Sequence, residues 1–492
     1  MGKEIMIRDL TFSYGGNGNQ LEHISLDIAA GEVIVMTGPS GSGKSSLTRV
    51  INGLIPYFYE GELSGEVFVD GKLLKEIPSW ERGKIVGNVF QDPRSQFFAN
   101  EVAGEVAFGC ENYGYSHEEI RNHVHRAAAD IKIQDILDHS LHSLSYGMRQ
   151  KVAIASAEAI DPEIYVMDEP SANLDIASTY RFADIIRALK QQGKTIIIAE
   201  HRLYYLMDLA DRFLCVQKGK IVREFTAQQM KALNNQEIQA LGLRTPDLHQ
   251  IEQTEISSAA TSEVVLEVKK LNHSFGETIV AKDIDFQCCQ GEVIALIGPN
   301  GTGKSTIGRI LAGLLKEKSG EVVLFGKHCR PKGRLGKVWY IPQDLDSQLF
   351  GEDLLDELTT GAEVNPERKQ AAEEILEALE LTPFIKQHPS TLSGGQKQRL
   401  ALGVALMHEA PIIVLDEPTS GLDGTNMRNV SRMIRKLAKM GRTIIVITHD
   451  AECALACCER AIRLENGCIT DDFQIRGAEL LLEKIGYDQK EG

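Results

Sequence analysis

Short apolar segments recur along the chain, and polar or glycine-rich stretches separate them. Residues 33–36 and 293–297 are apolar runs rich in β-branched side chains, and each leads into a glycine-rich loop and then a helix-like stretch. Residues 5–7 and 24–28 alternate between apolar and polar positions, which predicts short strands with one buried face. The pattern therefore predicts an α/β protein in which buried strands alternate with helices.

Further apolar runs, predicted to be strands, are each followed by polar side chains that could form a binding or catalytic site. The first half continues with a strand ending at Gln91, a polar helix-prone segment over 101–140, a strand closing on Asp168 and Glu169, and a last buried strand over 195–199 before His201. The second half continues with a strand ending at Gln343, a segment over 352–388, a strand closing on Asp416 and Glu417, and a last strand over 443–447 before His449. The same series of elements thus occurs twice.

The spacing of these positions confirms an internal repeat. Lys304 lies 260 positions after Lys44, whereas Asp416 and His449 each lie 248 positions after Asp168 and His201. The second half is therefore about a dozen residues shorter between its phosphate loop and its signature segment, in a region where loops vary in length. Residues 241–262 are rich in Thr, Gln, Ser and Ala, which is typical of a linker. The predicted domains are therefore 1–240 and 263–492, joined by a linker over 241–262.

The length, net charge and cysteine spacing of the chain disfavour several classes of protein. The chain of 492 residues is long enough for two domains with full cores, and its net charge of −16 disfavours a protein that coats nucleic acid. No apolar run reaches the length of a membrane span, and residues 1–5 lack the apolar centre of a signal peptide. The nine cysteines form no Cys-x-x-Cys pair, so reduced thiols are expected instead of disulfides or zinc.

The two glycine-rich loops match the pattern of a phosphate-binding loop. Such a loop directs backbone N–H groups and a helix N-terminus at anionic oxygens, while its Lys reaches the β- and γ-phosphates and its Ser ligates Mg²⁺. The aromatic residues Tyr14 and Phe275, upstream of the loops, are candidates for an adenine-stacking platform. The expected ATP-binding residues also include Gly38, Pro39, Ser40, Gly41, Ser42, Gly43, Lys44, Ser45 and Ser46, and Gly298, Pro299, Asn300, Gly301, Thr302, Gly303, Lys304, Ser305 and Thr306.

Together with the segments 144–150 and 392–398, which precede alanine-rich helical stretches, these motifs resemble the ATP-binding-cassette ATPases. The resemblance covers nearly the whole chain, twice. It implies two P-loop NTPase cassettes, each a RecA-like core with an antiparallel β subdomain and a helical signature subdomain. The Asp-x-x-Ser-Gln-Phe/Leu-Phe stretches at 92–98 and 344–350 resemble the energy-coupling-factor subgroup, whose ATPases drive uptake of vitamins or transition-metal ions.

The resemblance assigns roles to the paired polar residues, and the chemistry of Mg²⁺–ATP hydrolysis agrees with them. Glu169 and Glu417 are expected as general bases for the attacking water, while His201 and His449 hold the γ-phosphate or the water. Gln91 and Gln343 are expected to reach metal and water and to couple the site to the helical segment. The expected Mg²⁺ ligands are Ser45, Gln91 and Asp168, and Ser305, Gln343 and Asp416.

The signature loops imply a pair of composite sites. In the family, two cassettes pair head to tail, so that each signature completes the site of the other cassette, and here both cassettes lie on one chain. The second signature is intact, with Ser393, Gly394, Gly395 and Gln396. The first keeps Ser145 and Gly147, but Tyr146 replaces a glycine and Met148 replaces a glutamine. The site containing Lys44 and Glu169 is therefore expected to hydrolyse ATP faster.

The resemblance also implies partners and location. A transmembrane coupling protein and a substrate-binding membrane protein are expected at the cytoplasmic face of the membrane, with no nucleic acid. The helical segments after Gln91 and Gln343, with exposed pairs at 97–98 and 349–350, are expected to contact them. The alternatives are a soluble tandem cassette acting on ribosomes, a DNA-repair or chromosome cassette, and the tandem ATPase of a sugar importer. The sequence does not reveal the transported substrate.

Overall fold

The computed structural model describes residues 2–15, 18–251, 260–361 and 365–487. The chain divides into two compact units, Met1–Asp247 and Leu248–Gly492, and each is described by itself. The boundaries expected from the sequence, with a linker over 241–262, stay a prediction. Residues 252–259 of that linker lie outside the described residues.

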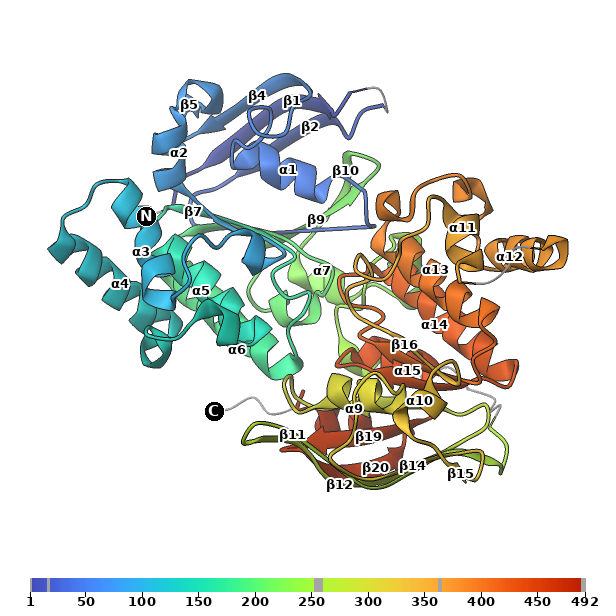
Figure 1. Ribbon diagram of the computed structural model, residues 1–492. Coiled ribbons are helices and arrows are strands. Elements are labelled where there is room, and N and C mark those ends of the chain that lie inside the picture. Colours follow the sequence, from blue (N-terminus) through green and yellow to red (C-terminus); the bar gives the residue numbers. More distant parts are fainter. Residues whose placement is uncertain (1, 16–17, 252–259, 362–364, 488–492) are drawn as a thin grey trace. The chain divides into compact units, whose positions relative to one another are not determined.

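A six-stranded sheet forms the centre of the first unit, in the order β10-β9-β3-β8-β7-β6 (Figure 1). The strands from β9 to β6 run parallel, and β10 pairs antiparallel with β9. The strands are β3 (Val33–Thr37), β6 (Val86–Val89), β7 (Ile164–Asp168), β8 (Thr195–Ala199), β9 (Arg212–Gln217) and β10 (Lys220–Phe225). Residues that follow the parallel strands therefore meet at one edge of the sheet, where α/β proteins bind ligands.

A smaller antiparallel sheet covers one side of this core, in the order β2-β1-β4-β5. Its strands are β1 (Ile5–Ser13), β2 (Leu21–Ile28), β4 (Glu62–Val69) and β5 (Lys72–Leu73). Buried side chains of this sheet, such as Ile7 and Leu26, pack in one cluster with Ile34 of β3 and Leu47 of the helix α1 (Lys44–Ile51). This packing fixes the start of α1 against both sheets.

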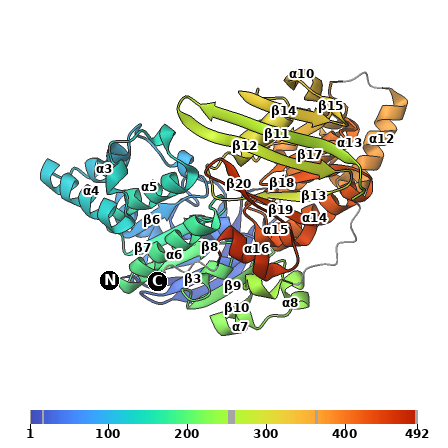
Figure 2. The same cartoon turned by 90° about the horizontal axis from the view of Figure 1, so that it is seen from below.

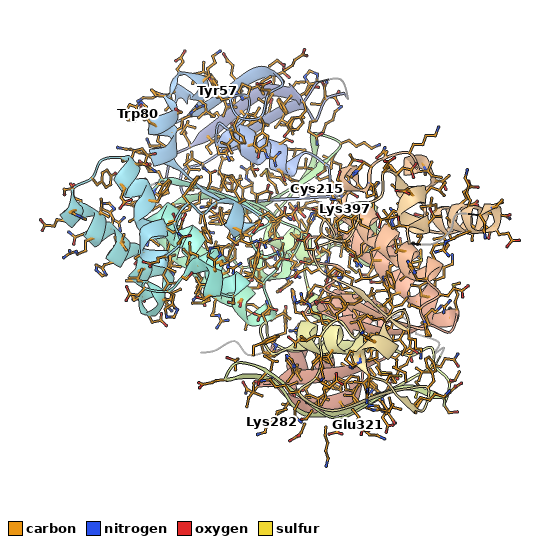
Figure 3. All side chains as sticks on the ribbon, in the orientation of Figure 1. Tyr57, Trp80, Cys215, Lys282, Glu321 and Lys397 are labelled. Atoms are coloured by element: carbon orange, nitrogen blue, oxygen red, sulfur yellow. The ribbon has the colours of Figure 1, made fainter. Side chains whose placement is uncertain are left out.

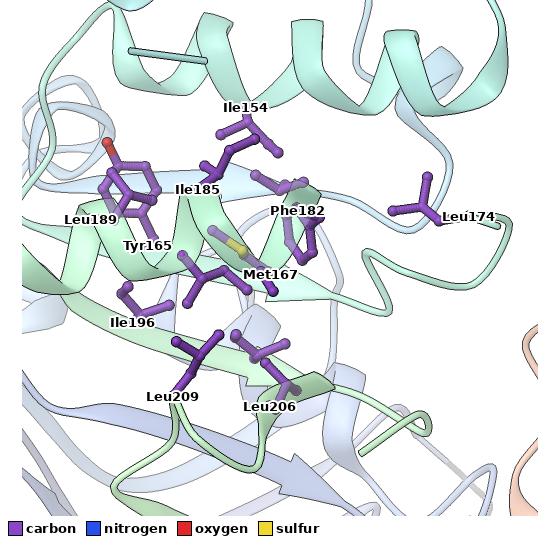
Figure 4. Close-up of a cluster of buried hydrophobic side chains, with 14 of the residues drawn as sticks. Ile154, Tyr165, Met167, Leu174, Phe182, Ile185, Leu189, Ile196, Leu206 and Leu209 are labelled. Atoms are coloured by element: carbon purple, nitrogen blue, oxygen red, sulfur yellow. The ribbon is translucent and has the colours of Figure 1, made fainter. Parts of the chain in front are cut away.

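Helices cover the opposite face of the parallel sheet. Figure 4 shows Ile154 of one helix and Phe182 of another packing over Met167 and Ile196, which belong to β7 and β8. The remaining helices of the unit are α2 (Ser79–Ile85), α3 (Val102–Asn112), α4 (His117–Ile131), α5 (Tyr146–Glu158), α6 (Ile176–Gln191), α7 (Ala227–Lys231) and α8 (Asn235–Ala240). The polar segment predicted to be helical, 101–140, contains α3 and α4.

The second unit repeats this architecture. Its parallel sheet has the order β16-β17-β18-β13-β19-β20, and its antiparallel sheet, visible as a separate layer in Figure 2, has the order β12-β11-β14-β15. The strands are β11 (Val264–Phe275), β12 (Thr278–Cys289), β13 (Val293–Ile297), β14 (Ser319–Leu324), β15 (Lys327–His328), β16 (Val338–Ile341), β17 (Ile412–Asp416), β18 (Thr443–Ile447), β19 (Arg460–Glu465) and β20 (Cys468–Gln474). The helices are α9 (Lys304–Leu311), α10 (Pro331–Arg334), α11 (Leu354–Thr359), α12 (Pro366–Ala378), α13 (Gly394–Met407), α14 (Gly424–Lys439), α15 (Ala451–Cys457) and α16 (Ala478–Ile485).

In each unit two strands follow the apolar run that the sequence predicts as the last strand. In the first unit β9 and β10 follow β8, and in the second β19 and β20 follow β18. The edge strand β10 leaves most of its side chains exposed, so it carries no apolar run that could reveal it. Across the described ranges, we find no helix with both the length and the apolarity needed to cross a bilayer.

Candidate functional site

The glycine-rich loops lie between β3 and α1 in the first unit and between β13 and α9 in the second. Gly38 has a φ of 138°, and a Cβ atom there would lie 2.1 Å from the carbonyl oxygen of Val216. Gly298 repeats this geometry, with a φ of 137° and a distance of 2.1 Å to the carbonyl oxygen of Leu464. A side chain is excluded at both positions, so glycine is required for each loop to turn close to the sheet.

A buried lysine begins the helix after each loop. The ammonium of Lys44 donates to the carbonyl oxygens of Gly38 and Pro39, both at 3.0 Å. Lys304 donates to the equivalent carbonyl oxygens of its own loop, at 2.8 and 2.7 Å. Each loop thus wraps around a positive charge at a helix N-terminus, which is the arrangement that binds phosphate.

A hydroxyl and a carboxylate meet beside each lysine. Ser45 Oγ donates to Asp168 Oδ1 at 3.0 Å, which joins the first residues of α1 to the end of β7. In the second unit Tyr340 Oη donates to Asp416 Oδ2 at 2.5 Å. Burial and the neighbouring Glu169 raise the pKa of Asp168 to about 6, and burial also raises the pKa of Asp416.

These oxygen atoms fit a Mg²⁺ ion. Mg²⁺ prefers hard oxygen ligands and usually takes one or two carboxylates from the protein together with substrate phosphates. The hydroxyl of Ser45 and the carboxylate of Asp168 already lie within hydrogen-bond distance, so one ion could contact both. A bound cation also favours the ionised form of a buried carboxylate, which offsets the desolvation of Asp168.

The glutamate after each strand-end aspartate has an unusual backbone conformation. Glu169 has a φ of 44° and Glu417 has a φ of 49°, in a region that non-glycine residues rarely adopt. The backbone N–H of Glu169 donates to Ala199 O, and that of Glu417 donates to Ile447 O, both at 2.8 Å. Such conformations cost about 1–3 kcal/mol each and persist where the surroundings impose them, often at functional sites.

The two glutamates have different side-chain partners. Gln91 Nε2 donates to Glu169 Oε2 at 2.7 Å, while His201 Nε2 lies 3.3 Å from Glu169 Oε1. In the second unit His449 Nδ1 lies 2.7 Å from Glu417 Oε1. The structure therefore brings His201, His449 and Gln91 to the carboxylates that the sequence predicts. Gln343 follows β16, as Gln91 follows β6.

The candidate adenine platforms are exposed aromatic rings. Tyr14 is 41% exposed, and its hydroxyl lies 3.2 Å from Ser46 Oγ, directly after the Lys44–Ser45 pair. Phe275 is 53% exposed and contacts His273 edge-on, with ring centroids 4.9 Å apart. Both rings have free surface that a flat base could cover.

Each signature serine caps a helix. Ser145 accepts a hydrogen bond from the Met148 N–H at 3.3 Å, at the start of α5. Ser393 caps α13 and forms a reciprocal capping box with Gln396, whose Oε1 accepts from the Ser393 N–H at 2.8 Å. Met148 cannot return that hydrogen bond, so the sequence difference at this position removes half of the box.

Two tyrosines that no sequence motif marks contact these residues. Tyr340 binds Asp416, as described above, and Tyr146 Oη donates to the carbonyl oxygen of Gln91 at 2.5 Å. Tyr146 was interpreted only as a bulky replacement for glycine. Tyr340 had no counterpart in the repeat that could mark it, because Asn88 occupies the equivalent position in β6.

Comparisons with known proteins agree with this geometry. The model of the family described as ABC transporter matches residues 21–172 and 281–420, which contain both phosphate loops, both signatures and both Asp-Glu pairs. A "Putative ABC transporter ATP-binding protein" of Treponema denticola is 39% identical over 479 residues, covering 96% of this chain and 98% of the relative. The "Putative HMP/thiamine import ATP-binding protein YkoD" of Bacillus subtilis is 30% identical over 515 residues, covering 99% of this chain and 94% of the relative.

Solved structures share the tandem fold. A chain in a model of ribosome-bound archaeal Pelota and ABCE1 has a TM-score of 0.69 and 24% identity, covering 97% of this chain and 81% of that chain. A structure of RNase-L Inhibitor has a TM-score of 0.65 and 22% identity, covering 97% and 93%. On the match of the family model and of full-length relatives, the chain belongs to the ABC transporter family and contains two ABC ATPase domains in tandem.

Proposed function

We propose that this chain is the ATP-binding and ATP-hydrolysing subunit that powers a membrane importer of the energy-coupling-factor type, for a vitamin or a transition-metal ion. The observation that carries the ATPase part is the duplicated set of Lys, Ser, Asp, Glu and His at one edge of each parallel sheet. The import part is supported by the relative named for HMP/thiamine import, which matches almost the whole chain.

In this proposal each residue of the set has a task in hydrolysis. The loop N–H groups and Lys44 bind the β- and γ-phosphates of ATP, and Tyr14 stacks on adenine. Ser45, Asp168 and Gln91 are the proposed ligands of Mg²⁺, which would neutralise phosphate charge.

Glu169 would orient the attacking water and take its proton while the bond between the γ-phosphorus and the β–γ bridging oxygen breaks. His201, which is buried beside it, would hold the γ-phosphate or the water. The second unit would use Lys304, Ser305, Asp416, Glu417 and His449, with Gln343, in the same way.

We further propose that the two units, as cassettes 1–240 and 263–492, pair head to tail within the chain. Ser145 and Ser393 support this, because the hydrogen bonds of Ser145 and the capping box of Ser393 are local to the starts of their own helices. The N–H groups at those helix starts would complete the phosphate site of the other cassette.

Membrane subunits are the proposed partners, and the cytoplasmic face of the membrane is the proposed location. The surface after each glutamine offers one exposed aromatic ring. Phe98 is 74% exposed and stacks on Phe108, with ring centroids 4.6 Å apart, and Phe350 is 76% exposed. The sequence predicts that both members of each pair are exposed, but Phe97 packs against the core and Leu349 is buried.

A soluble role on the ribosome is the competing function. The likeness to a ribosome-bound ABCE1 structure, at 24% identity, is a likeness of fold. Tandem ABC folds occur in both classes, so this likeness does not favour the ribosomal role.

The catalytic assignment is tested by replacing both glutamates with glutamine. The double variant Glu169→Gln/Glu417→Gln should bind ATP normally and lose turnover by at least ~10²-fold, because glutamine cannot accept the proton of the attacking water. Nucleotide binding and steady-state phosphate release measure the two effects. Turnover close to that of the unaltered chain would refute the assignment.

A further inference from the structure

Tyr146 lies where the second unit has Gly394, at the first position of α5. Its ring is partly buried and packs against the hydrophobic core of its own unit. Burial raises the pKa of its hydroxyl to about 12, so Tyr146 keeps its proton in the neutral range and acts as a donor. The hydroxyl donates to the carbonyl oxygen of Gln91 at 2.5 Å.

Gln91 continues this connection to the proposed general base. Its side-chain Nε2 donates to Glu169 Oε2 at 2.7 Å, so two hydrogen bonds join the start of α5 to that carboxylate. The other carboxylate oxygen, Oε1, lies 3.3 Å from His201. Both oxygens of Glu169 therefore have defined neighbours.

The second unit is arranged differently at the same place. Gly394 has no side chain that could reach the glutamine loop, and Glu417 lies closer to its histidine, with His449 Nδ1 at 2.7 Å. The signature helix there contacts the segment after Gln343 through the ion pair between Lys397 and Asp346. Lys397, labelled in Figure 3, thus makes a contact with the loop that does not depend on the residue at position 394.

We infer that Tyr146 is a positioning residue for Glu169 of its own unit. Its hydroxyl fixes the main chain at Gln91, and the amide of Gln91 then holds the carboxylate in one orientation. This inference rests on the proposed function, in which Glu169 is a general base. It differs from the effect of Tyr146 on the opposite site, which would come from the bulk of the ring and not from its hydroxyl.

The variant Tyr146→Phe separates the two effects, because it removes the hydroxyl and keeps the ring. In a Glu417→Gln chain, where only the site with Glu169 is live, we expect kcat to fall about three- to tenfold with KM for ATP unchanged, as for loss of one hydrogen bond. In a Glu169→Gln chain, where Glu169 no longer acts as a base, the same substitution should lower kcat by a smaller factor. Tyr57→Phe, which alters an exposed tyrosine of the first unit, is the matched control.

A double-mutant cycle tests whether Tyr146 acts through Gln91. In a Glu417→Gln chain that also carries Gln91→Ala, Tyr146→Phe should cause no further loss of kcat, because the connection is already broken. If the losses of kcat caused by Tyr146→Phe and by Gln91→Ala multiply instead, the inference is overturned.

Two other results would overturn it as well. These are an unchanged kcat in the Glu417→Gln/Tyr146→Phe chain, and equal losses in both single-site backgrounds. If the Glu417→Gln chain itself hydrolysed no ATP while it bound the nucleotide, the proposed function of the first site would fail instead.

Discussion

Glu169 and Glu417 occupy equivalent positions, and their surroundings differ in ways that bear on catalysis. Both have a positive φ directly after a buried strand. Glu169 is contacted by Gln91 and lies 3.3 Å from His201, whereas Glu417 is contacted by His449 at 2.7 Å. Two sites with the same residues can therefore differ in rate.

We predict that the site with Lys44 and Glu169 hydrolyses ATP faster than the site with Lys304 and Glu417. Under head-to-tail pairing the faster site receives the intact signature, and the slower one receives Tyr146 and Met148. Loss of one or two hydrogen bonds in the transition state corresponds to roughly 1–3 kcal/mol, or ~5- to 150-fold. Single-turnover hydrolysis by Glu169→Gln and by Glu417→Gln, each within the partnered complex, measures the difference. Equal residual rates, or a larger loss in Glu417→Gln, would contradict it.

The sequence marks the proposed site residues by their spacing, but it does not mark their contacts. The glycine loops, the strand-end acids and the histidines follow fixed spacings, because phosphate and metal binding constrain each residue type. The tyrosine contacts depend on how a helix start packs beside a loop distant in sequence. Neither motif nor periodicity contains that information, so Tyr146 could be recognised as a departure but not as a donor to Gln91.

Among the elements, helix α5 begins at the signature and packs against β7, the strand that ends at Asp168. Glu158, at the end of α5, is buried and accepts a hydrogen bond from the Tyr165 hydroxyl of β7, where Figure 4 shows that ring in the apolar cluster. Burial raises the pKa of Glu158, and the hydrogen bond from Tyr165 offsets part of the effect. The buried carboxyl of Glu158 thus lies between α5 and β7, the strand that positions Asp168.

This carboxyl makes stability depend on pH. Between the ordinary glutamate pKa of the unfolded chain and the raised pKa of the folded one, the folded state keeps a proton that the unfolded state has lost. The stability of the first unit therefore falls as pH rises through that interval.

We predict that Glu158→Gln stabilises the chain more at pH 8 than at pH 5. The difference should be on the order of 1 kcal/mol in the free energy of unfolding, or ~2 °C in the melting temperature. Thermal unfolding at the two pH values measures it, with the exposed Glu118→Gln as control. A gain that is the same at both pH values, or larger at pH 5, would show that the buried charge does not limit stability.

The aromatic surface after the glutamine loops gives a prediction for docking. Phe98→Glu should weaken recruitment to the membrane subunits and leave ATP binding unchanged, because the ring is exposed and lies beyond the phosphate loop. Phe58→Glu is the matched control, since Phe58 is also 74% exposed in the same unit. Detergent co-purification measures recruitment. Equal recovery of both variants and the unaltered chain would exclude this surface.

At the scale of the whole molecule, duplication is the dominant feature. The sequence predicted the repeat and the strands β3, β7 and β8 from their apolar runs, together with their equivalents in the second unit. It missed β9 and β10 and, in the second unit, β19 and β20. The side chains of β10 and β20 are mostly outside the core and leave no clear period. Both units keep the full set of proposed site residues, as the proposed use of two ATP molecules requires.

We propose above that this ATPase powers a membrane importer. The most direct measurement is purification of the tagged full chain from detergent-solubilised membranes of its own cells, with the stoichiometry of its partners and the ATPase rate of the complex determined together. We predict two kinds of integral membrane protein in fixed ratio to the chain, and ATP hydrolysis that the double variant Glu169→Gln/Glu417→Gln abolishes. Recovery of the folded, ATP-hydrolysing chain with ribosomes and without any membrane protein would contradict it.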